Sequence, residues 1–289
     1  MKIKRPIIHL VVIIVIGVLT ISSPQLLMAQ EQSNIGVIKK NGMVVSAHEL
    51  ASNVGRDILL KGGNAFDAAA AVHFALTVVY PQAGNIGGGG FAVFHTESGD
   101  NGALDFREKA PLAATKDMYL DDNQEIVKGK STLGHLAVGV PGSVDGIIQL
   151  HEKYGILPFK KIIQPAIDLA YFGHAINAQL ANDLNRFQEA FASVNDRQTI
   201  YNKKTPWKTG DHHINQPLTA TLILIRDKGR NGFYKGIIAD MIVKESNAGH
   251  GIITYQDLMD YNSVWRVPTK GIRDMKSLPC RHHRVVELH

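Results

Sequence analysis

A glycine-rich stretch and an arginine that follows it carry the clearest potential for chemistry in this chain. Residues 84–90 contain five glycines, and Arg107 lies just beyond two short apolar runs. Glycines lack a Cβ atom, so the backbone there can approach a ligand or a neighbouring element closely. A guanidinium beside such a loop can hold a carboxylate with two parallel hydrogen bonds, which lysine cannot reproduce. The alternative is that Arg107 pairs with Glu108 or Asp105, as most clustered surface charges do.

Other residue patterns argue against common catalytic and nucleotide sites. Residues 84–90 match neither the dinucleotide fingerprint nor the lysine-bearing phosphate loop, because the spacing and the following residues differ. Ser143 does not lie in a Gly-x-Ser-x-Gly elbow, so we expect it to cap a helix rather than act as a nucleophile. His48 and His151 each precede a glutamate, but neither has a second histidine four residues later, as zinc proteases require.

The paired histidines His212 and His213 lie in a stretch that reads as a polar loop. We expect both to be exposed to solvent, with metal binding as the weaker alternative. The sequence offers no convincing activated nucleophile, so it predicts no catalytic residue, no metal and no cofactor in these 289 residues.

Composition is that of a globular enzyme. The chain is 45% hydrophobic and 20% charged, and its formal net charge is +5. The basic residues are scattered and not interleaved with aromatics, so the sequence predicts no nucleic-acid partner. Cys280 is the single cysteine, which excludes an internal disulfide and any zinc site built on two or more cysteines.

The N-terminus predicts export. Basic residues within the first five positions precede an apolar run over residues 7–21, and a polar stretch then ends at Ala29. This pattern is typical of a secretory signal peptide over residues 1–29, cleaved after Ala29, with residues 30–40 as a linker. The expected location is periplasmic or extracellular. The alternative is an uncleaved membrane anchor through residues 7–21, although that run is short for a full span.

Helical spacing and capping signals precede the glycine-rich stretch. Apolar residues predict a helix over Glu49–Leu60, ended by the glycine pair at 62–63. Asn64 then caps a helix over Ala65–Val79, with Asp67 completing a capping box. The small residues of this second helix predict close packing on all of its faces.

Short apolar runs predict strands. Residues 91–94 and 103–106 should form a hairpin buried on both faces, residues 42–48 should begin as a strand, and residues 137–140 should form another. Further helices are predicted over residues 112–120, 144–153, 158–171 (kinked or divided at Pro165), 178–194, 218–228, 237–246 and 254–261.

Several motifs stand in a characteristic order between residues 36 and 268. They are Gly62-Gly63-Asn64-Ala65, Asp67-Ala68-Ala69, Pro81-Gln82, residues 86–91, Asp105-Phe106-Arg107-Glu108, Val140-Pro141-Gly142, Gln164-Pro165-Ala166, Phe233-Tyr234-Lys235-Gly236, and Asp257-Leu258 with Tyr261. With these motifs the chain resembles the large-subunit portion of the γ-glutamyltransferase (glutathione hydrolase) family. Residues 41–273 are assigned to this region, which is incomplete. One departure is Ala83-Gly84-Asn85, where the family more often has serines.

The resemblance implies an α+β fold, part of the four-layer αββα sandwich of N-terminal-nucleophile hydrolases. It implies a precursor that cuts itself into large and small subunits, the new N-terminal threonine being the nucleophile. The substrates would be glutathione and other γ-glutamyl compounds, with water, amino acids or peptides as acceptors. By motif, Arg107 corresponds to the arginine that binds the substrate's α-carboxylate. The catalytic threonine and the small subunit are expected C-terminal to His289.

The family pattern fails after about Arg273, which makes residues 274–289 a divergent tail. The family resemblance leads us to expect Met-Pro-Pro-Pro-Ser-Ser-Gly-Gly near residues 279–287. Reading the third base of each codon with the first two of the next permits all eight of these residues in the shifted frame. We therefore expect a frameshift, in the genome or in the sequencing, to end this reading frame.

Two functional classes remain open. The first is an exported γ-glutamyltransferase of which this chain is a truncated large-subunit fragment. The second is a non-catalytic remnant, either a pseudogene product or a binding fragment. In both cases the 289-residue chain alone is expected to be inactive.

Overall fold

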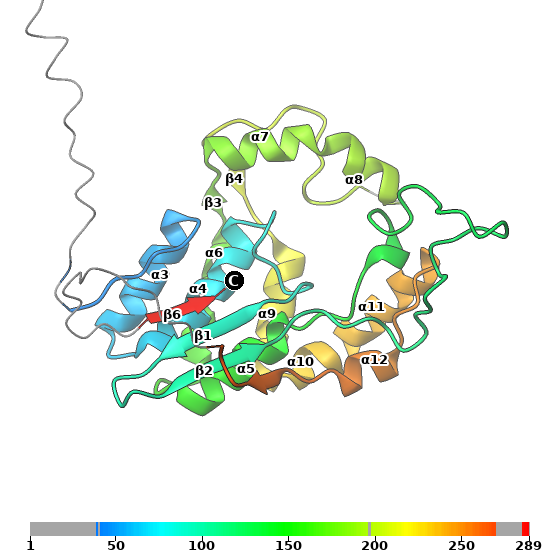
Figure 1. Cartoon of the computed structure of the whole chain (residues 1–289). Coiled ribbons are helices and arrows are strands. Elements are labelled where there is room, and N and C mark those ends of the chain that lie inside the picture. The colour runs from blue at the N-terminus through cyan, green and yellow to red at the C-terminus, as the bar shows by residue number, and fades with distance from the viewer. Residues whose placement is uncertain (1–38, 40, 196–197, 270–284, 289) are drawn as a thin grey trace, which may run out of the picture. The chain divides into compact units, whose positions relative to one another are not determined.

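The computed structural model describes residue 39 and residues 41–195, 198–269 and 285–288 (Figure 1). The predicted signal peptide lies outside these residues, as do most of the linker and most of the divergent tail. Everything described below belongs to the unit that begins at Met43. Within the described residues, no helix is long and apolar enough to cross a membrane.

Helix α3 (Glu49–Leu60) is closed at both ends by local contacts, as predicted. At its start the Nδ1 atom of His48 accepts a hydrogen bond from the Leu50 N–H at 3.2 Å. At its end Gly62 has a φ angle of 88°. The N–H groups of Gly62 and Gly63 then donate to carbonyls of the last turn at 3.0 Å. This is the Schellman arrangement, in which glycine adopts a left-handed conformation at little cost.

Helix α4 (Ala65–Val79) is the central helix of the unit. Its predicted capping box is confirmed, since Asn64 accepts from the Phe66 and Asp67 N–H groups and Asp67 accepts from the Asn64 N–H. Eleven of its 15 residues are buried, so it is packed on nearly every side. Its neighbours are α3, α5 (Ser143–Tyr154) and α6 (Phe159–Phe172). Small residues permit these close approaches, as the composition predicted.

The four-stranded sheet is antiparallel at each pairing, in the order β5-β2-β1-β6. Its strands are β1 (Phe91–His95), β2 (Asn101–Asp105), β5 (Val264–Arg266) and β6 (Val285–Leu288). The hairpin of β1 and β2 is confirmed, but the prediction that it is buried on both faces is wrong. Along β1, Ala92 and Phe94 are buried, whereas Phe91 and Val93 are 41% and 47% exposed. Successive side chains of a strand point to opposite faces, and the described helices cover one of them.

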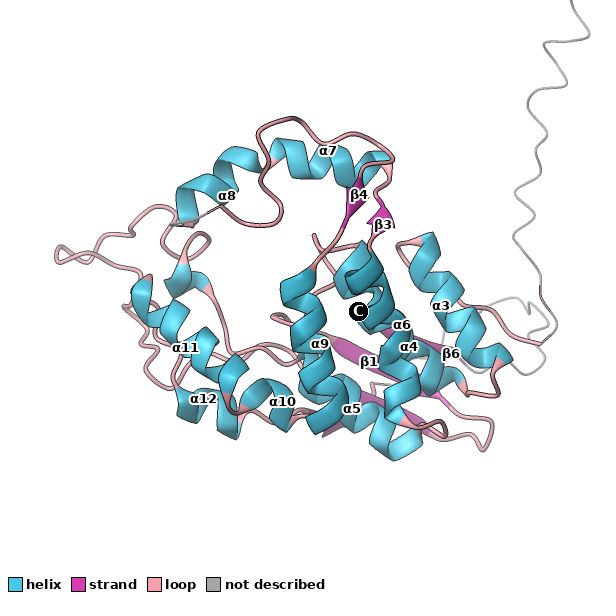
Figure 2. Ribbon diagram, turned by 180° about the vertical axis from the view of Figure 1, so that it is seen from behind, coloured by secondary structure: helices cyan, strands magenta, loops and turns pink. Residues whose placement is uncertain are grey.

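The remaining helices of this part are α9 (Gln216–Lys228), α10 (Asn231–Tyr234), α11 (Ile237–Ala248) and α12 (Tyr255–Asp260). They follow one another from α6, since α9 packs on α6, α10 on α9, α11 on α10 and α12 on α11 (Figure 2). Helix α6 is continuous through Pro165, so the predicted alternative of a division into two helices at this proline is wrong. The main core includes residues from α3, α4, α5, α6, α9 and the hairpin.

A two-stranded ribbon leads to a smaller helical lobe away from the sheet (Figures 1 and 2). Its strands are β3 (His174–Ala175) and β4 (His212–His213), and its helices are α7 (Ala178–Arg186) and α8 (Gln188–Val194). The predicted single helix over 178–194 is therefore two helices that meet at Phe187. The lobe has its own small core, formed by Ile176, Leu180, Ala181 and Leu184.

Four further expectations were wrong. Residues 42–48 pair with no strand of the described part. Residues 112–120 form turns instead of a helix, and Leu112 is exposed, so no apolar stripe exists there. Residues 137–140 form only the end of a 3-10 turn (His135–Ala137) and one isolated bridge at Val140. Gly142, not Ser143, is the N-cap of α5, and no side chain caps that helix.

Candidate functional site

The second half of the glycine-rich stretch is fixed by backbone hydrogen bonds. The carbonyl of Gly88 accepts from the N–H groups of Gly142 and Ser143, at 2.7 and 3.0 Å. Gly90 and Phe106 exchange two hydrogen bonds, at 3.3 and 3.0 Å, which extend the hairpin by one pair. The loop therefore lies between the start of α5 and the segment that follows β2.

Gly89 packs directly on the backbone that leads to Arg107. A Cβ atom at Gly89 would lie 2.5 Å from the Phe106 carbonyl oxygen, 2.9 Å from the Arg107 carbonyl carbon and 2.7 Å from the Glu108 nitrogen. Real Cβ atoms do not approach backbone so closely, so only glycine fits here. The expected close approach is confirmed, with a neighbouring segment of the chain as the partner.

Arg107 leaves the end of β2 with its side chain 60% exposed. Its Nε lies 3.3 Å from Oε2 of Glu108, and its guanidinium carbon lies 5.9 Å from the centre of the Phe91 ring. The ion pair with Glu108 is thus present, as the alternative interpretation predicted. An exposed pair of this kind contributes less than about 1 kcal/mol, so a carboxylate ligand can compete for the guanidinium.

Asp105 binds the backbone of Arg107 rather than its side chain. Its Oδ1 accepts from the Arg107 N–H at 3.1 Å, and its Oδ2 accepts from Nε of Arg266 at 2.7 Å. Burial opposes ionisation of Asp105, but these two donors outweigh it and hold its pKa below the ordinary value. Asp105 therefore stays anionic, paired with Arg266, and leaves the Arg107 guanidinium to face solvent and Glu108.

The other candidates of the sequence have structural roles. His48 caps α3. His151 is buried beside Asp67, with 3.3 Å between its Nε2 and Oδ1 of the carboxylate. Ser143 is buried in the first turn of α5. None of these side chains forms a nucleophile–base pair with another.

His213 contradicts the expectation of an exposed pair, whereas His212 is exposed as expected. His213 is 4% exposed and pairs across the ribbon with His174, which is 5% exposed. Neither ring nitrogen of either histidine has a hydrogen-bond partner in the part of the chain that the structure describes. Burial, reinforced by the neighbouring imidazoles, lowers the pKa of His174 to about 4. The described residues contain no group of three or more His, Cys, Asp or Glu side chains that could hold a metal.

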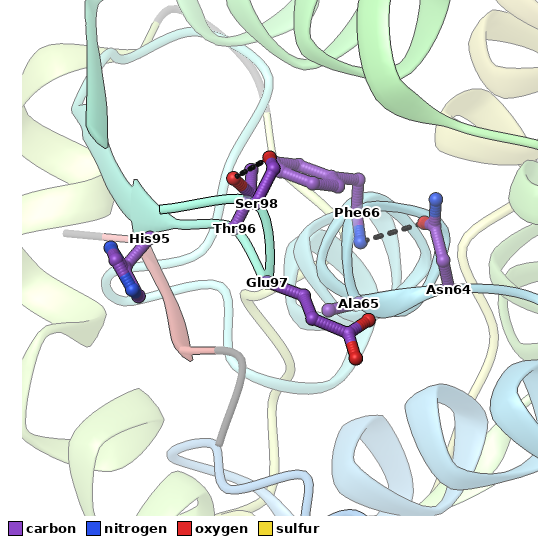
Figure 3. Close-up of a pocket in the computed structure, with 7 residues that line it drawn as sticks. All are labelled: Asn64, Ala65, Phe66, His95, Thr96, Glu97 and Ser98. Atoms are coloured by element: carbon purple, nitrogen blue, oxygen red, sulfur yellow. Dashed lines mark hydrogen bonds between the residues drawn. The ribbon is translucent and has the colours of Figure 1, made fainter. Parts of the chain in front are cut away.

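A separate pocket of about 410 Å³ lies between the start of α4 and the turn after β1 (Figure 3). Residues 64–66 and 95–98 line it. Several of its polar groups already bind one another, since Asn64 accepts from the Phe66 N–H at 2.9 Å and the Thr96 and Ser98 hydroxyls lie 2.7 Å apart. Arg107 is not among the lining residues, so this pocket does not contain the candidate site.

One residue of the site was missed at the level of sequence. Tyr261 was noted only as part of a motif, yet its hydroxyl donates to the carbonyl of Arg107 at 2.8 Å. The two residues are 154 positions apart, so no local pattern could have indicated this contact.

Comparison with known proteins gives one consistent result. The model of the family described as Gamma-glutamyltranspeptidase matches residues 51–277. A glutathione hydrolase proenzyme from Pseudomonas sp. (strain A14) is 47% identical over 244 residues, which cover 84% of this chain and 42% of that protein. The crystal structure of Helicobacter pylori gamma-glutamyltranspeptidase superposes with a TM-score of 0.80 at 43% identity, covering 87% of this chain and 70% of that one.

A more distant structural match supports the same fold. The cephalosporin acylase from Bacillus halodurans superposes with a TM-score of 0.70 at 28% identity, over 84% of this chain and 47% of that chain. The chain spans about two fifths of the length of the curated relatives, 42% and 40% for the Pseudomonas protein and its Escherichia coli counterpart. Since the family model matches most of its length, the chain belongs to the γ-glutamyltranspeptidase family.

Proposed function

We propose that this chain is the large-subunit part of an exported γ-glutamyltransferase. The intact enzyme would cleave the γ-glutamyl amide of glutathione and pass the γ-glutamyl group to water, an amino acid or a peptide. The observation that carries the proposal is the exposed guanidinium of Arg107 at the end of β2. It lies beside the glycine-rich stretch, in which position 89 accommodates only glycine. A relative that is 47% identical and named a glutathione hydrolase proenzyme supports the choice of substrate.

Arg107 would bind the α-carboxylate of the γ-glutamyl donor. A planar guanidinium can make two parallel hydrogen bonds to a carboxylate, which fixes the orientation of the donor as well as its position. Binding would exchange the weak pair with Glu108, at 3.3 Å, for these two bonds. The donor's γ-carbonyl would then face a nucleophile from outside the described residues, a threonine at the start of the small subunit.

The sheet offers a place for that small subunit. Phe91 and Val93 leave the outward face of β1 apolar and partly exposed. In the proposed four-layer αββα sandwich a second sheet packs on this face, with aligned strands about 10 Å away. This would bring residues of the second sheet close to the end of β2 where Arg107 lies.

Export and truncation complete the proposal. Residues 1–29 would act as a signal peptide cleaved after Ala29, and the alternative is an anchor through residues 7–21. The divergent tail, residues 274–289, would result from a frameshift, since the motif expected there can be read in the shifted frame. On its own the 289-residue chain would have no γ-glutamyltransferase activity, because it would lack the nucleophile.

The first test is an accurate nucleotide read across codons 270–289 and the DNA downstream. We expect the shifted frame to continue into a threonine-led small subunit. The restored gene should give a self-cleaving protein that hydrolyses γ-glutamyl-p-nitroanilide. If the shift is genuine in the genome, the product is instead the non-catalytic remnant. A downstream sequence without such a frame would contradict the explanation of the tail.

The second test concerns Arg107 in the restored enzyme. Arg107→Ala should raise KM for the donor by about 100-fold, the effect of losing two charge-assisted hydrogen bonds. Arg107→Lys should recover only a small part of the loss, because lysine lacks the two-pronged geometry. Arg56→Ala is the matched control, since Arg56 is an exposed arginine that pairs with its neighbour Asp57. Equal KM values for the Arg107 variants and the wild type would refute the assignment.

A further inference from the structure

We propose that Tyr261 is a positioning residue that holds the backbone of Arg107 in the orientation that donor binding requires. This inference rests on the proposed function, since it assigns a role within the same site. It concerns the end of α12, a helix that approaches the site from another part of the chain.

The contact between Tyr261 and Arg107 is a partly buried hydrogen bond. The Tyr261 hydroxyl donates to the Arg107 carbonyl at 2.8 Å, and the tyrosine side chain belongs to a residue that is only 2% exposed. Burial raises the pKa of Tyr261 well above its ordinary value. The hydroxyl therefore keeps its proton at any physiological pH and remains a donor.

The Tyr261 ring is itself fixed by its neighbours. It stacks on Tyr234 with 5.8 Å between ring centres and 8° between ring planes. The ammonium of Lys109 lies 5.0 Å from its centre and donates to the carbonyl of Asn262 at 2.7 Å. A Cβ atom at Gly142 would overlap the Tyr261 hydroxyl, so glycine at that position permits the approach.

An ion pair between the partly exposed Arg230 and the buried carboxylate of Asp145 ties the backbone around Tyr261 to α5. Asp145 accepts from Nε of Arg230 at 2.6 Å, and Arg230 also donates to the carbonyl of Tyr261. The same carboxylate accepts from the N–H and hydroxyl of Ser263, at 2.7 and 2.6 Å. Chain positions 261 and 263 are thereby attached to α5, the helix whose start holds the glycine loop.

These contacts matter because the Arg107 side chain receives little direction of its own. It is largely exposed, and its sequence neighbour Glu108 supplies its ion pair. The direction of the Arg107 side chain therefore depends on its own backbone. Asp105 accepts a hydrogen bond from the Arg107 N–H, and Tyr261 donates one to the Arg107 carbonyl. Removing the hydroxyl alone should release one of these two restraints and leave the packing of the tyrosine ring in place.

The kinetic test uses Tyr261→Phe in the enzyme of the proposed function. We expect KM for the γ-glutamyl donor to rise about five- to tenfold, the factor that corresponds to one hydrogen bond, with kcat nearly unchanged. In an Arg107→Ala background the same substitution should have no further effect on KM, because Tyr261 affects donor binding only through Arg107. Tyr255→Phe is the matched control, an exposed tyrosine on the same helix whose hydroxyl binds Asp240. It should leave KM as in the wild type.

A second measurement needs no activity. In the purified 289-residue chain, hydrogen exchange followed by mass spectrometry should be faster across residues 105–112 in Tyr261→Phe than in wild type or Tyr255→Phe. If exchange is faster but the wild-type enzyme has no turnover, the proposed function fails and the positioning of Arg107 stands. Unchanged exchange overturns the inference. So does an active enzyme whose KM does not respond to Tyr261→Phe, or responds equally with and without Arg107.

Discussion

Acid should open the β3–β4 ribbon, because His174 and His213 are buried as neutral imidazoles. The pKa of His174 falls from 6.5 to about 4, first through burial and then through the imidazoles of His213, His48 and His212. An open ribbon exposes the ring and restores its ordinary pKa, so below pH 6.5 the open state binds a proton that the closed state excludes. Stability of the closed ribbon is thus complete above pH 6.5 and falls as the pH drops toward 4.

The expected loss is about 3 kcal/mol at pH 4 for His174 alone, from about 1.4 kcal/mol for each unit of pKa. His213 adds to it in the same direction, because burial and the adjacent His212 lower its pKa as well. The aromatic rings of Tyr201 and Trp207 pack on His213 at 5.7 and 5.6 Å and offer it no hydrogen-bond acceptor in the described contacts. Beside the ribbon, in the part of the chain that the structure describes, Lys203 pairs with Asp211; both side chains are partly exposed, so the pair contributes little.

The assay is hydrogen exchange of the ribbon and of α7 between pH 7 and pH 4, corrected for the intrinsic exchange rate. Protection should fall over this range in the wild type. Protection should fall much less in the double variant His174→Leu/His213→Phe. These substitutions keep side-chain volume in the ribbon and remove both imidazoles that could bind a proton. His250→Asn is the control, since His250 is exposed and its φ of 61° suits asparagine. A pH dependence that survives the double substitution, or one absent from the wild type, would refute the reasoning.

Three other perturbations follow from single contacts. Asp145→Ala should lower the free energy of unfolding by about 3–5 kcal/mol in urea titrations, because it leaves the Arg230 guanidinium without its buried partner. Gly89→Ala should destabilise the chain by about 1–3 kcal/mol, since its Cβ would press on backbone 2.5 Å away, and the thermal midpoint should fall accordingly. Replacing Phe91 and Val93 together by threonine should reduce self-association in light scattering, because both are exposed apolar side chains on one face of β1. Unchanged scattering would show that this face does not mediate association.

The elements that sequence reasoning located correctly are those whose ends are set by nearby residues. The capping box of Asn64 and Asp67 and the left-handed Gly62 involve contacts within a few positions of the chain. Such contacts are visible as residue types at fixed spacing. The hairpin was found for the same reason, since both of its strands and the turn between them fall within residues 91–105.

The errors concern contacts between distant segments. His213 lies in a polar stretch, and its burial depends on pairing with His174, 39 positions earlier. The burial of one face of β1 depends on packing against α4 and α5, where Phe66 and Tyr154 contact the ring of Phe94. The residue types from Phe91 to His95 do not reveal this packing by themselves. A helix is predicted over residues 112–120, but Asp257 accepts a hydrogen bond from the Leu112 N–H at 2.7 Å and the segment forms turns.

The glycine-rich stretch shows how residue types and contacts between distant segments combine at the site. Its composition suggested that a ligand or another part of the chain comes close, and the structure shows the second. Gly89 and Gly142 come from different segments, and each would collide with the carbonyl of Phe106 if it carried a Cβ atom, while one at Gly146 would collide with the Phe106 ring. Their shared task is therefore to let the backbone before Arg107 lie deep between the hairpin and α5. The hydroxyl of Tyr261 then donates to the carbonyl of Arg107, so the backbone that carries the guanidinium is held at Arg107 as well as at Phe106.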